Sequence, residues 1–290
     1  MPKLKFRFKI LAELTKLRIT LFVTLTTGVG FIAAAGELNA KFIAPVAGIL
    51  ILACGSAIVN HIQERNTDVL MNRTKSRPIP SGEISVANAT ILALIFICTG
   101  TLILFFGAGI LAMGLALLNL IWYNAIYTPL KKKSSLAILP GSLVGAIPPA
   151  VGWVAAGGHI LDKGIIIISA FFFIWQIPHF WLLMISFDHE YKKAGFPTIT
   201  KFFNKEQFAR IIYIWIVATV VTGLLIPFFN VVEFSFLYYS MLVAGILLTW
   251  SAAKLINRQN ENISFRFAFR EINLFALLVL LVISVDKLII

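Results

Sequence analysis

The chain has 290 residues, of which 59% are hydrophobic and only 13% are charged, and its mean hydropathy is +0.90. This composition is too apolar and too poor in charge for a water-soluble domain, so it indicates a protein that crosses a membrane several times. The formal net charge of +12 could suggest nucleic-acid binding, but the positions of the charges, described below, exclude that class.

Nine apolar runs are long enough to cross a bilayer as α-helices, which need about 17 to 25 residues. We therefore predict an all-α bundle of nine transmembrane helices that forms one domain over residues 1–290. In chain order the runs are 19–35, 42–60, 86–106, 110–127, 136–157, 164–187, 211–229, 234–253 and 269–290.

The basic residues are distributed unevenly between the two ends of these runs. All but three of the 25 Lys and Arg residues fall before the first run, in every second loop or, in the case of Arg270, at the start of the ninth run beside such a loop. The exceptions are Lys41, Lys163 and Lys287. Cytoplasmic segments of membrane proteins are enriched in Lys and Arg. The bias therefore predicts that the N-terminal segment, 1–18, is cytoplasmic.

The second run ends in three hard oxygen donors at four-residue spacing, Asn60, Glu64 and Asp68, which we call the acid ladder. If the helix continues through them, each step of four turns about 40° and rises roughly 6 Å, so the side chains share one face. Such donors suit Mg²⁺, which takes one or two carboxylates together with oxygens of a substrate phosphate. The sequence therefore predicts catalytic metal ligands here, at the start of a cytoplasmic loop, 61–85.

A cluster of basic residues follows in this loop, at Arg73, Lys75 and Arg77. Guanidinium and ammonium groups bind phosphate oxygens, so the acidic and basic groups together predict a magnesium–diphosphate site. The alternative is an ordinary solvated loop, which often carries charges beside an apolar helix. The stiff, turn-forming segment 77–82 (Arg-Pro-Ile-Pro-Ser-Gly) favours the site, because a simple connector does not need it.

The fourth run leads into Pro129, which we expect to end the helix, and three lysines follow at 131–133. They lie at the same predicted membrane face as the acid ladder. Lys131 is the best candidate for a diphosphate ligand, because it is nearest the membrane. The alternative is that all three lysines act only as topology signals.

The fifth run is rich in small residues and contains the pair Pro148-Pro149. Small residues let helices approach closely in a membrane, so we interpret the glycines as packing positions. The proline pair is predicted to kink or break this helix. A membrane protein tolerates this where neighbouring helices or a cavity satisfy the freed backbone groups.

The sixth run carries a histidine inside the apolar stretch, and an acidic cluster follows it. His179 lies among aromatic residues, with Gln176 nearby. An ionisable side chain inside a membrane is a functional hypothesis by default, although a structural histidine with satisfied hydrogen bonds is the alternative. Asp188 and Glu190, in the expected cytoplasmic loop 188–210, lie at the same mouth as the acid ladder, but a spacing of two does not place both on one helical face.

The last three runs have few polar groups in their interiors, so we expect them to be scaffold. The phenylalanine-rich segment 226–236 could also wall a channel for a long hydrocarbon. The second and sixth runs both lead into acidic clusters, which suggests two related four-helix halves followed by a ninth helix.

Together these motifs resemble the UbiA superfamily of intramembrane prenyltransferases, and within it the branch that farnesylates protohaem IX. The resemblance extends over essentially the whole chain. The residues that carry it are the acid ladder and the segments 71–74 (Met-Asn-Arg-Thr), 77–82, 127–131 (Tyr-Thr-Pro-Leu-Lys), 145–149 (Gly-Ala-Ile-Pro-Pro) and 178–181 (Pro-His-Phe-Trp). The acid ladder marks the superfamily, whereas the Arg-Pro-Ile-Pro and Pro-His-Phe-Trp elements mark the haem branch.

The resemblance implies a helical bundle with a lateral opening to lipid and a cavity capped on the cytoplasmic side, in a bacterial cytoplasmic (inner) membrane. It implies that farnesyl diphosphate alkylates a vinyl group of haem B (protohaem IX), giving haem O and diphosphate for the biogenesis of haem–copper terminal oxidases. Mg²⁺ is the implied cofactor, held by Asn60, Glu64 and Asp68. His179 and Trp181 are the implied haem-binding residues, and a haem A synthase is a candidate partner protein.

The chain departs from the family pattern at three places. The family usually has aspartate where this chain has Glu64 and Glu190, and its Lys-Pro-Arg before the first run is Lys-Leu-Arg here, at 16–18. A second pair of acids four residues apart, typical of quinone-type members, is missing at the sixth run. Its absence from the sequence argues against a symmetric two-metal site.

Two other functions share parts of this pattern. A prenyltransferase for a quinone precursor or another aromatic acceptor would have the acid ladder, but it would also need the second acid pair. A secondary transporter would have charges lining a cavity near the bilayer midplane, whereas these acids cluster at one mouth. The pattern therefore favours the haem-branch prenyltransferase.

Overall fold

The computed structural model describes residues 2–256 and 261–289, with side chains at 8–256 and 265–289. Within these residues every regular element is helical, and nine helical spans are long and apolar enough to cross a membrane. The predicted all-α bundle of nine transmembrane helices is therefore confirmed. Met1 of the expected segment 1–18 and Ile290 of the last expected run lie outside the described residues.

Several of the nine spans contain more than one helical segment. In chain order they are built from α2 (Leu17–Ala35), η1 (Ala40–Phe42) with α3 (Ile43–Asp68), α4 (Val86–Ala108), α5 (Ile110–Ile121) with η2 (Trp122–Tyr127) and α6 (Thr128–Leu130), η3 (Ser135–Ala137) with α7 (Ile138–Gly141) and α8 (Leu143–Ala155), α9 (Lys163–Ser186), α11 (Lys205–Leu225) with η5 (Pro227–Phe229), α12 (Ser235–Ala253) and α13 (Glu261–Ile289). The short helices outside the spans are α1 (Pro2–Leu14), α10 (Asp188–Lys193) and η4 (Ile199–Lys201).

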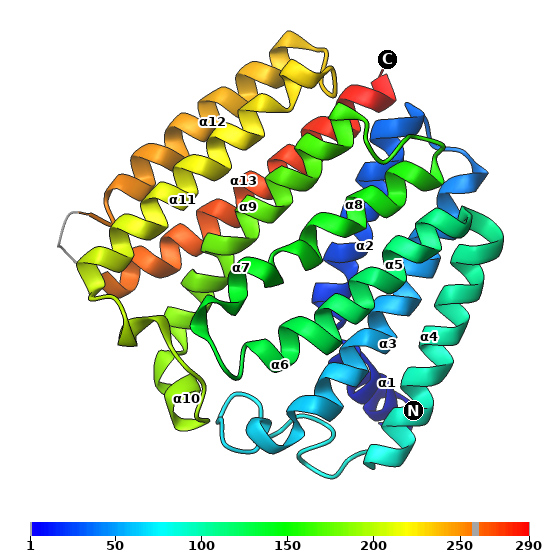
Figure 1. Ribbon diagram of the computed structural model, residues 1–290, viewed down its shortest axis with the longest axis vertical. Helices are drawn as coiled ribbons and strands as arrows, with labels where there is room; N and C mark the ends of the chain where they lie inside the picture. The colour runs from blue at the N-terminus through cyan, green and yellow to red at the C-terminus, as the bar shows by residue number, and fades with distance from the viewer. Residues whose placement is uncertain (1, 257–260, 290) are drawn as a thin grey trace.

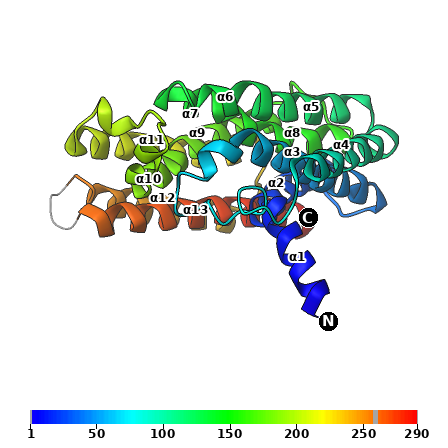
Figure 2. The ribbon, with the colours of Figure 1, turned by 90° about the horizontal axis from the view of Figure 1, so that it is seen from below.

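The helices form a ring in which the last span closes on the first. The helix α2 contacts α3 and α8, and α8 in turn contacts α5 and α9. On the other side α9 contacts α11, and α12 contacts both α11 and α13. Because α13 also contacts α2, segments from the two ends of the sequence lie side by side (Figure 1, Figure 2).

The segments that carry most of the candidate site residues lie at one end of the helical bundle. The loop between α3 and α4 lies there with α6 and α10, whereas the C-terminal end of α13 lies at the opposite end (Figure 1). The helix α1 projects away from the bundle (Figure 2). The loops that carry most of the candidate site residues are therefore neighbours in space, although the sequence separates them widely.

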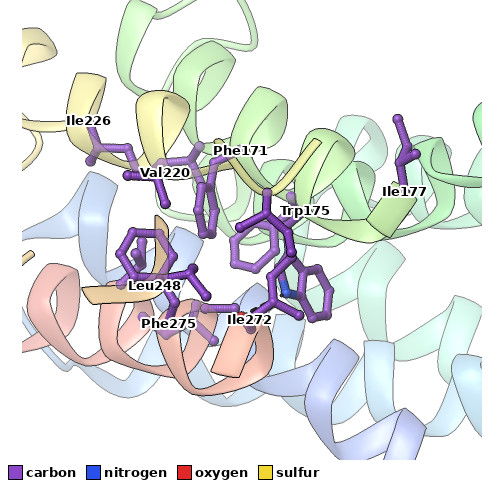
Figure 3. Close-up of a cluster of buried hydrophobic side chains, with 14 of the residues drawn as sticks. Phe171, Trp175, Ile177, Val220, Ile226, Leu248, Ile272 and Phe275 are labelled. Atoms are coloured by element: carbon purple, nitrogen blue, oxygen red, sulfur yellow. Dashed lines mark hydrogen bonds between the residues drawn. The ribbon is translucent and has the colours of Figure 1, made fainter. Parts of the chain in front are cut away.

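The second half of the chain packs around large apolar side chains. Phe171 and Trp175 of α9 lie against Ile272 and Phe275 of α13, with Val220 of α11 beside them (Figure 3). The rings of Phe171 and Phe275 have centroids 6.3 Å apart, and the indole N–H of Trp175 donates to the carbonyl of Ile272 at 3.2 Å. A buried indole needs such a partner, so this contact fixes α9 against α13.

Close contact between α2 and α8 depends on glycine. A Cβ atom on Gly152 would lie 1.8 Å from the carbonyl oxygen of Thr27, and one on Gly30 would lie 2.0 Å from the carbonyl oxygen of Pro149. The two backbones therefore touch without intervening side chains. This confirms the packing role predicted for the small residues of the fifth span.

The predicted break at Pro148-Pro149 does not occur. The helix α8 continues through both prolines, and the interruption of this span lies at Ser142, between α7 and α8. The helix lacks two backbone donors at the prolines, but it is held on three sides by α2, α5 and α9. Packing against neighbours therefore keeps the helix continuous where the local preference alone would interrupt it.

Candidate active site

The helix α3 continues beyond the apolar run and carries the acid ladder on one face. It runs from Ile43 to Asp68, so Asn60, Glu64 and Asp68 lie on successive turns, as the spacing predicts. Their exposed fractions are 0%, 6% and 0%. Buried amides and carboxylates need polar or charged partners, and the surrounding segments supply them.

Each member of the acid ladder contacts a basic side chain from another part of the chain. The pairs are Lys16 with Asn60, Lys131 with Glu64, and Arg77 with Asp68. The first is a hydrogen bond to the amide oxygen at 2.5 Å, and the other two are ion pairs. We call Lys16, Arg77 and Lys131 the cation triad, because they converge on one helical face.

The two lysines of the cation triad differ in their electrostatic surroundings. Burial lowers the pKa of Lys16 to about 7, although the nearby carboxylate of Glu64 acts in the opposite direction. Burial also disfavours the charged form of Lys131, but the Glu64 carboxylate outweighs it and raises the pKa of Lys131 above its usual range. The site therefore stabilises positive charge more strongly at Lys131 than at Lys16.

Lys16 adopts a left-handed backbone conformation between α1 and α2. Its φ and ψ are 50° and 47°, a region that only Lys16 and Asn230 enter among the described non-glycine residues. This conformation is unfavourable for an L-residue, and residues that adopt it are enriched at functional sites. Here it accompanies the contact with Asn60, and the ammonium group also lies 3.5 Å from the hydroxyl of Tyr123.

A π-helical turn shapes the wall beside the acid ladder. This turn, η2, covers Trp122–Tyr127, and the rings of Tyr123 and Tyr127 stack with centroids 6.0 Å apart. The carbonyl of Asn124 in the same turn accepts a hydrogen bond from Gln63 of α3 at 2.9 Å. Single π turns occur frequently at functional sites, and this one joins the fourth span to the helix that carries the acids.

A cavity of about 340 Å³ lies against these charges. Its charged end is lined by Glu64, Asp68 and the cation triad. Its remaining walls are largely apolar and come mainly from α2, α3, α5, α8 and α9; they include Ile19, Val23, Ile49, Leu52, Ala116 and Phe180. The cavity therefore joins a charged mouth to an apolar interior.

The predicted basic ligands of the 61–85 loop are placed differently from one another. Arg73 lines the cavity, and its guanidinium carbon lies 4.7 Å from the ring centroid of Phe187. Lys75 is exposed on the same loop and lies outside the lining of this cavity. The structure thus brings Arg73, Arg77 and Lys131 together and leaves Lys75 apart.

Asp188 and Glu190 bind different partners. Asp188 forms an ion pair with Lys192 at 2.6 Å and accepts a hydrogen bond from Thr200 at 2.8 Å. Burial raises the pKa of Asp188, but the hydrogen bonds from these two partners outweigh it and lower the pKa below its usual range. Glu190 accepts the backbone N–H of Arg73 at 3.4 Å. Glu190 thus joins the two polar loops, whereas Asp188 contacts only its own loop, and both acids lie outside the cavity lining.

His179 lies between α9 and α13. Its Nδ1 is 2.7 Å from Oδ1 of Asn273, and its ring lies 4.8 Å from the ring of Trp175 and 5.0 Å from that of Phe269. The lining of the cavity does not include His179 itself, although Phe180 of the same helix belongs to it. The histidine thus lies beside the cavity, enclosed by aromatic rings.

Trp181 also lies outside the cavity lining. It is 5% exposed, and its ring packs against Phe208 and Trp215 with centroids 6.4 and 6.3 Å away. Both partners belong to α11. The structure therefore places Trp181 in the packing between α9 and α11 and does not bring it to His179.

The acid ladder fits Mg²⁺ in the chemistry of its donors. The ladder offers two carboxylates, both of which line the cavity, and one amide oxygen. No group of three His, Cys, Asp or Glu side chains lies together among the described residues. Mg²⁺ is usually held by one or two carboxylates, with waters and substrate phosphates completing its shell. The acid ladder leaves coordination positions of a bound Mg²⁺ open. The oxygens of a diphosphate can fill them, as in a metal–diphosphate site.

A model of the UbiA prenyltransferase family matches residues 21–278 of the chain. The chain belongs to this family. A protoheme IX farnesyltransferase from Geobacter sulfurreducens is 40% identical to it over 185 residues, which are 64% of this chain and 68% of the relative. A protoheme IX farnesyltransferase from Nitratidesulfovibrio vulgaris is 31% identical over 248 residues, which are 86% of each chain.

Solved structures share the fold of this UbiA prenyltransferase. A structure of digeranylgeranylglyceryl phosphate synthase has a TM-score of 0.80 and covers 100% of both chains at 17% identity. A UbiA homologue from Archaeoglobus fulgidus, solved with DMAPP and Mg²⁺, has a TM-score of 0.70 and covers 97% of this chain and 99% of its own at 16% identity. The family and the nine apolar spans together make this protein an integral membrane prenyltransferase.

Sequence reasoning missed part of this UbiA prenyltransferase site. The position of Lys16 just before the first span is compatible with a side chain that points into a cytoplasmic cavity, and Lys16 does line the cavity, but the sequence gave no sign of its contact with Asn60. Thr128 belongs to the segment 127–131 that carries the family resemblance, but nothing in the sequence indicated that it accepts a hydrogen bond from the Asn60 amide, at 2.9 Å. Tyr123 lines the cavity, but its spacing from Tyr127 becomes informative only once η2 is known.

Proposed function

We propose that this chain transfers the farnesyl group of farnesyl diphosphate to a vinyl group of haem B, giving haem O and diphosphate. The relatives from two bacteria that are named protoheme IX farnesyltransferase support this substrate pair. The observation that carries the proposal is the cation triad, which converges on the acid ladder at the charged end of an apolar cavity. A prenyl diphosphate has the same two parts, an anionic head and an apolar chain.

The proposed setting is a bacterial cytoplasmic (inner) membrane, with the charged end of the cavity facing the cytoplasm. The support is the bias of Lys and Arg toward this end, with only Lys41, Lys163 and Lys287 elsewhere. Residues 1–290 would act as one domain, with 61–85 and 188–210 as its cytoplasmic catalytic loops. A haem A synthase is the proposed partner that takes the product.

Asn60, Glu64 and Asp68 are the proposed holders of Mg²⁺. The bound ion would supply positive charge to the diphosphate as its bond to the farnesyl carbon breaks. The two carboxylates are already buried beside the cavity, so their positions need no large rearrangement. The role of the ladder is thus to fix the head of the substrate at the charged end.

Arg77 and Lys131 have a second proposed role once the metal and diphosphate arrive. Both are now ion-paired with acids that the metal would engage, and both line the cavity. When the acids turn to the metal, these cations can bind the diphosphate oxygens, which carry the developing negative charge. Arg73, which also lines the cavity, and Lys75 are the further proposed contacts from the same loop.

The reaction then needs a pocket that keeps water from the farnesyl carbon until the vinyl group attacks. The carbon–oxygen bond of farnesyl diphosphate breaks and its electrons leave with the diphosphate. The vinyl π electrons form the new carbon–carbon bond, and water adds to the adjacent carbon and loses a proton, leaving a hydroxyethylfarnesyl side chain. The apolar and aromatic walls, including Tyr127 and Phe180, would exclude water from the first step.

A competition between acceptors tests this proposal. Purified protein in lipid nanodiscs is incubated with farnesyl diphosphate and Mg²⁺, together with equal concentrations of haem B and 4-hydroxybenzoate, and the products are separated by mass spectrometry. The proposal predicts that farnesylated haem accumulates and the aromatic acid is recovered unchanged. Farnesylation of the acid alone would move the chain to the quinone-precursor branch, and no product with either acceptor would reject both.

A further inference from the structure

Two polar side chains meet in the apolar interior, away from the charged end of the cavity. His179 of α9 has its Nδ1 2.7 Å from Oδ1 of Asn273 on α13. The amide nitrogen of Asn273 donates to the carbonyl of Phe269 at 2.6 Å. Because a carbonyl only accepts, this second bond fixes which end of the amide faces the histidine. The amide oxygen of Asn273 is therefore directed at His179.

This orientation determines which nitrogen of His179 carries the proton. An amide oxygen is an acceptor, so Nδ1 must be the donor, and the lone pair of a neutral imidazole then lies on Nε2. Within the described part of the chain, Nε2 has no hydrogen-bond partner and is not one of the fully enclosed polar atoms. His179 thus presents an open lone pair from a ring that Asn273 holds in place.

His179 lies on the stripe of α9 that borders the cavity. Gln176 and Leu183 line the cavity, and they lie three residues before and four residues after His179 on α9. Residues at these spacings occupy one stripe of a helix. The rings of Trp175 and Phe269 flank the imidazole at 4.8 and 5.0 Å. The histidine therefore lies among flat apolar surfaces at the margin of the cavity, as an iron porphyrin would need.

The other histidines of the chain are placed less suitably. The sequence contains four, and His61 is only 1% exposed and lies outside the cavity lining. His159 is exposed between α8 and α9, and His189 is exposed on α10. Only His179 combines an apolar, aromatic environment, an open nitrogen and a place beside the cavity.

We infer that Nε2 of His179 is an axial ligand of the haem iron, and that Asn273 is the positioning residue that fixes its tautomer and ring orientation. The inference rests on the proposed function, because it takes haem B as the acceptor substrate. Metal-binding histidines usually donate their second N–H to a carbonyl or carboxylate, and loss of that partner typically costs about 10- to 100-fold in metal affinity. Iron bound here would hold the porphyrin against α9 and α13 while its edge reaches the cavity.

The test is a spectroscopic titration that needs no turnover. Haem B is added to the purified protein in nanodiscs, and its affinity, its optical spectrum and the iron–histidine stretch in the resonance Raman spectrum of the ferrous form are recorded. The variants are His179→Gly, Asn273→Leu and Asn273→Asp, and His159→Ala is the matched control. Thermal unfolding of each variant shows that it is folded.

The inference predicts a different result for each variant. His179→Gly loses the iron–histidine stretch and regains histidine-like ligation when free imidazole is added. Asn273→Leu keeps the ligand but binds haem about 10- to 100-fold more weakly, with a lower stretching frequency. Asn273→Asp keeps an acceptor for Nδ1, so it retains affinity and raises the frequency, and His159→Ala matches the unmodified protein.

Three outcomes would overturn the inference. They are an unmodified protein with no histidine-ligated haem, a His179→Gly variant with an unchanged spectrum, and an Asn273→Leu variant unchanged in both affinity and stretching frequency. The proposed function is judged separately by product formation. Haem O made without histidine ligation would reject only the inference, whereas histidine-ligated haem that is never farnesylated would reject only the function.

Discussion

One nitrogen of Arg77, Nη1, lies 2.8 Å from both carboxylate oxygens of Asp68. The Asp68 side chain is only 1% exposed and that of Arg77 is 16% exposed, so water screens this pair weakly. A metal ion bound to the same oxygens would lie close to the positive charge of the Arg77 guanidinium group, which repels it. A metal ion must therefore compete with Arg77, unless a diphosphate draws the guanidinium away.

This competition predicts opposite effects of Arg77→Gln on two ligands. Mn²⁺, used as a probe for Mg²⁺, should bind the variant alone about 10-fold more tightly, because Asp68 is freed. A thiolo analogue of farnesyl diphosphate should bind about 10-fold more weakly, because a cation is lost. Both factors lie within the usual range of coupling between two sites, and electron paramagnetic resonance of Mn²⁺ measures them.

The control is Arg65→Gln, because Arg65 is exposed on α3, the helix that carries Asp68, and its guanidinium group donates to the carbonyl of Ile62 at 2.7 Å. It should change neither affinity. Metal affinity that falls in Arg77→Gln would contradict the account, since it would mean that Arg77 supports the metal instead of competing with it.

Replacement of Lys131 tests the role of the cation paired with Glu64. Lys131→Gln removes the charge from the cavity lining, and we expect kcat to fall by about 10²- to 10³-fold, the usual effect of losing one group that stabilises transition-state charge. Lys133→Gln is the matched control, because Lys133 is exposed two residues away and lies outside the cavity lining. Equal rates in the two variants would assign both lysines to membrane topology alone.

The contact between α2 and α8 predicts an unequal response to two Gly→Ala changes. Gly152→Ala places a methyl group 1.8 Å from the Thr27 carbonyl oxygen, so the helices must separate. We expect the unfolding free energy to fall by about 1–3 kcal/mol. Gly114→Ala, in open space on α5, should be neutral or gain up to about 1 kcal/mol. Thermal unfolding in detergent measures both, and equal melting temperatures would contradict the close contact.

Asp286 is a buried carboxylate at the end of the bundle opposite the acid ladder. Its replacement is expected to lower the stability of the protein and to leave substrate binding unchanged. Asp286 of α13 is 0% exposed and accepts the backbone N–H groups of Glu233 and Phe234, each at 2.9 Å at its closest. Asp286→Leu should lower the unfolding free energy by about 1–3 kcal/mol for each donor left unpaired, and Asp286→Asn by less, because one oxygen remains. If the Asp286→Leu variant has the same melting temperature as the unmodified protein, Asp286 does not stabilise the bundle through these hydrogen bonds.

The sequence predicted the parts of the site that one helix carries. The four-residue spacing of Asn60, Glu64 and Asp68 placed them on one face, because helix geometry alone decides this. It could not predict that Lys16 reaches Asn60, since that contact depends on a left-handed residue at the break between α1 and α2. Likewise, His179 stood out as an intramembrane histidine, but its partner Asn273 lies 94 residues away, and only the packing of α9 on α13 brings them together.

The prolines of the fifth span also show that contacts between helices can outweigh local sequence preferences. Pro148 and Pro149 disfavour a helix locally, and the sequence therefore predicted a kink or a break there. The helix α8, packed against its neighbours, continues through both prolines, and the interruption of this span lies at Ser142. Local chemistry thus predicted the spans and the acid ladder, whereas contacts between distant helices decided the cavity and its partners.

The most direct test of metal-dependent farnesyl transfer at the acid ladder compares the products of Asp68→Asn and of the unmodified protein. Both are incubated with haem B, farnesyl diphosphate and Mg²⁺ in H₂¹⁸O, with and without EDTA, and haem products are weighed by mass spectrometry. The account predicts haem that has gained one farnesyl group and one ¹⁸O hydroxyl in the unmodified protein, and loss of this product with EDTA or in Asp68→Asn. Full product from Asp68→Asn, or with EDTA, would contradict the assignment of farnesyl transfer to a metal site on the acid ladder.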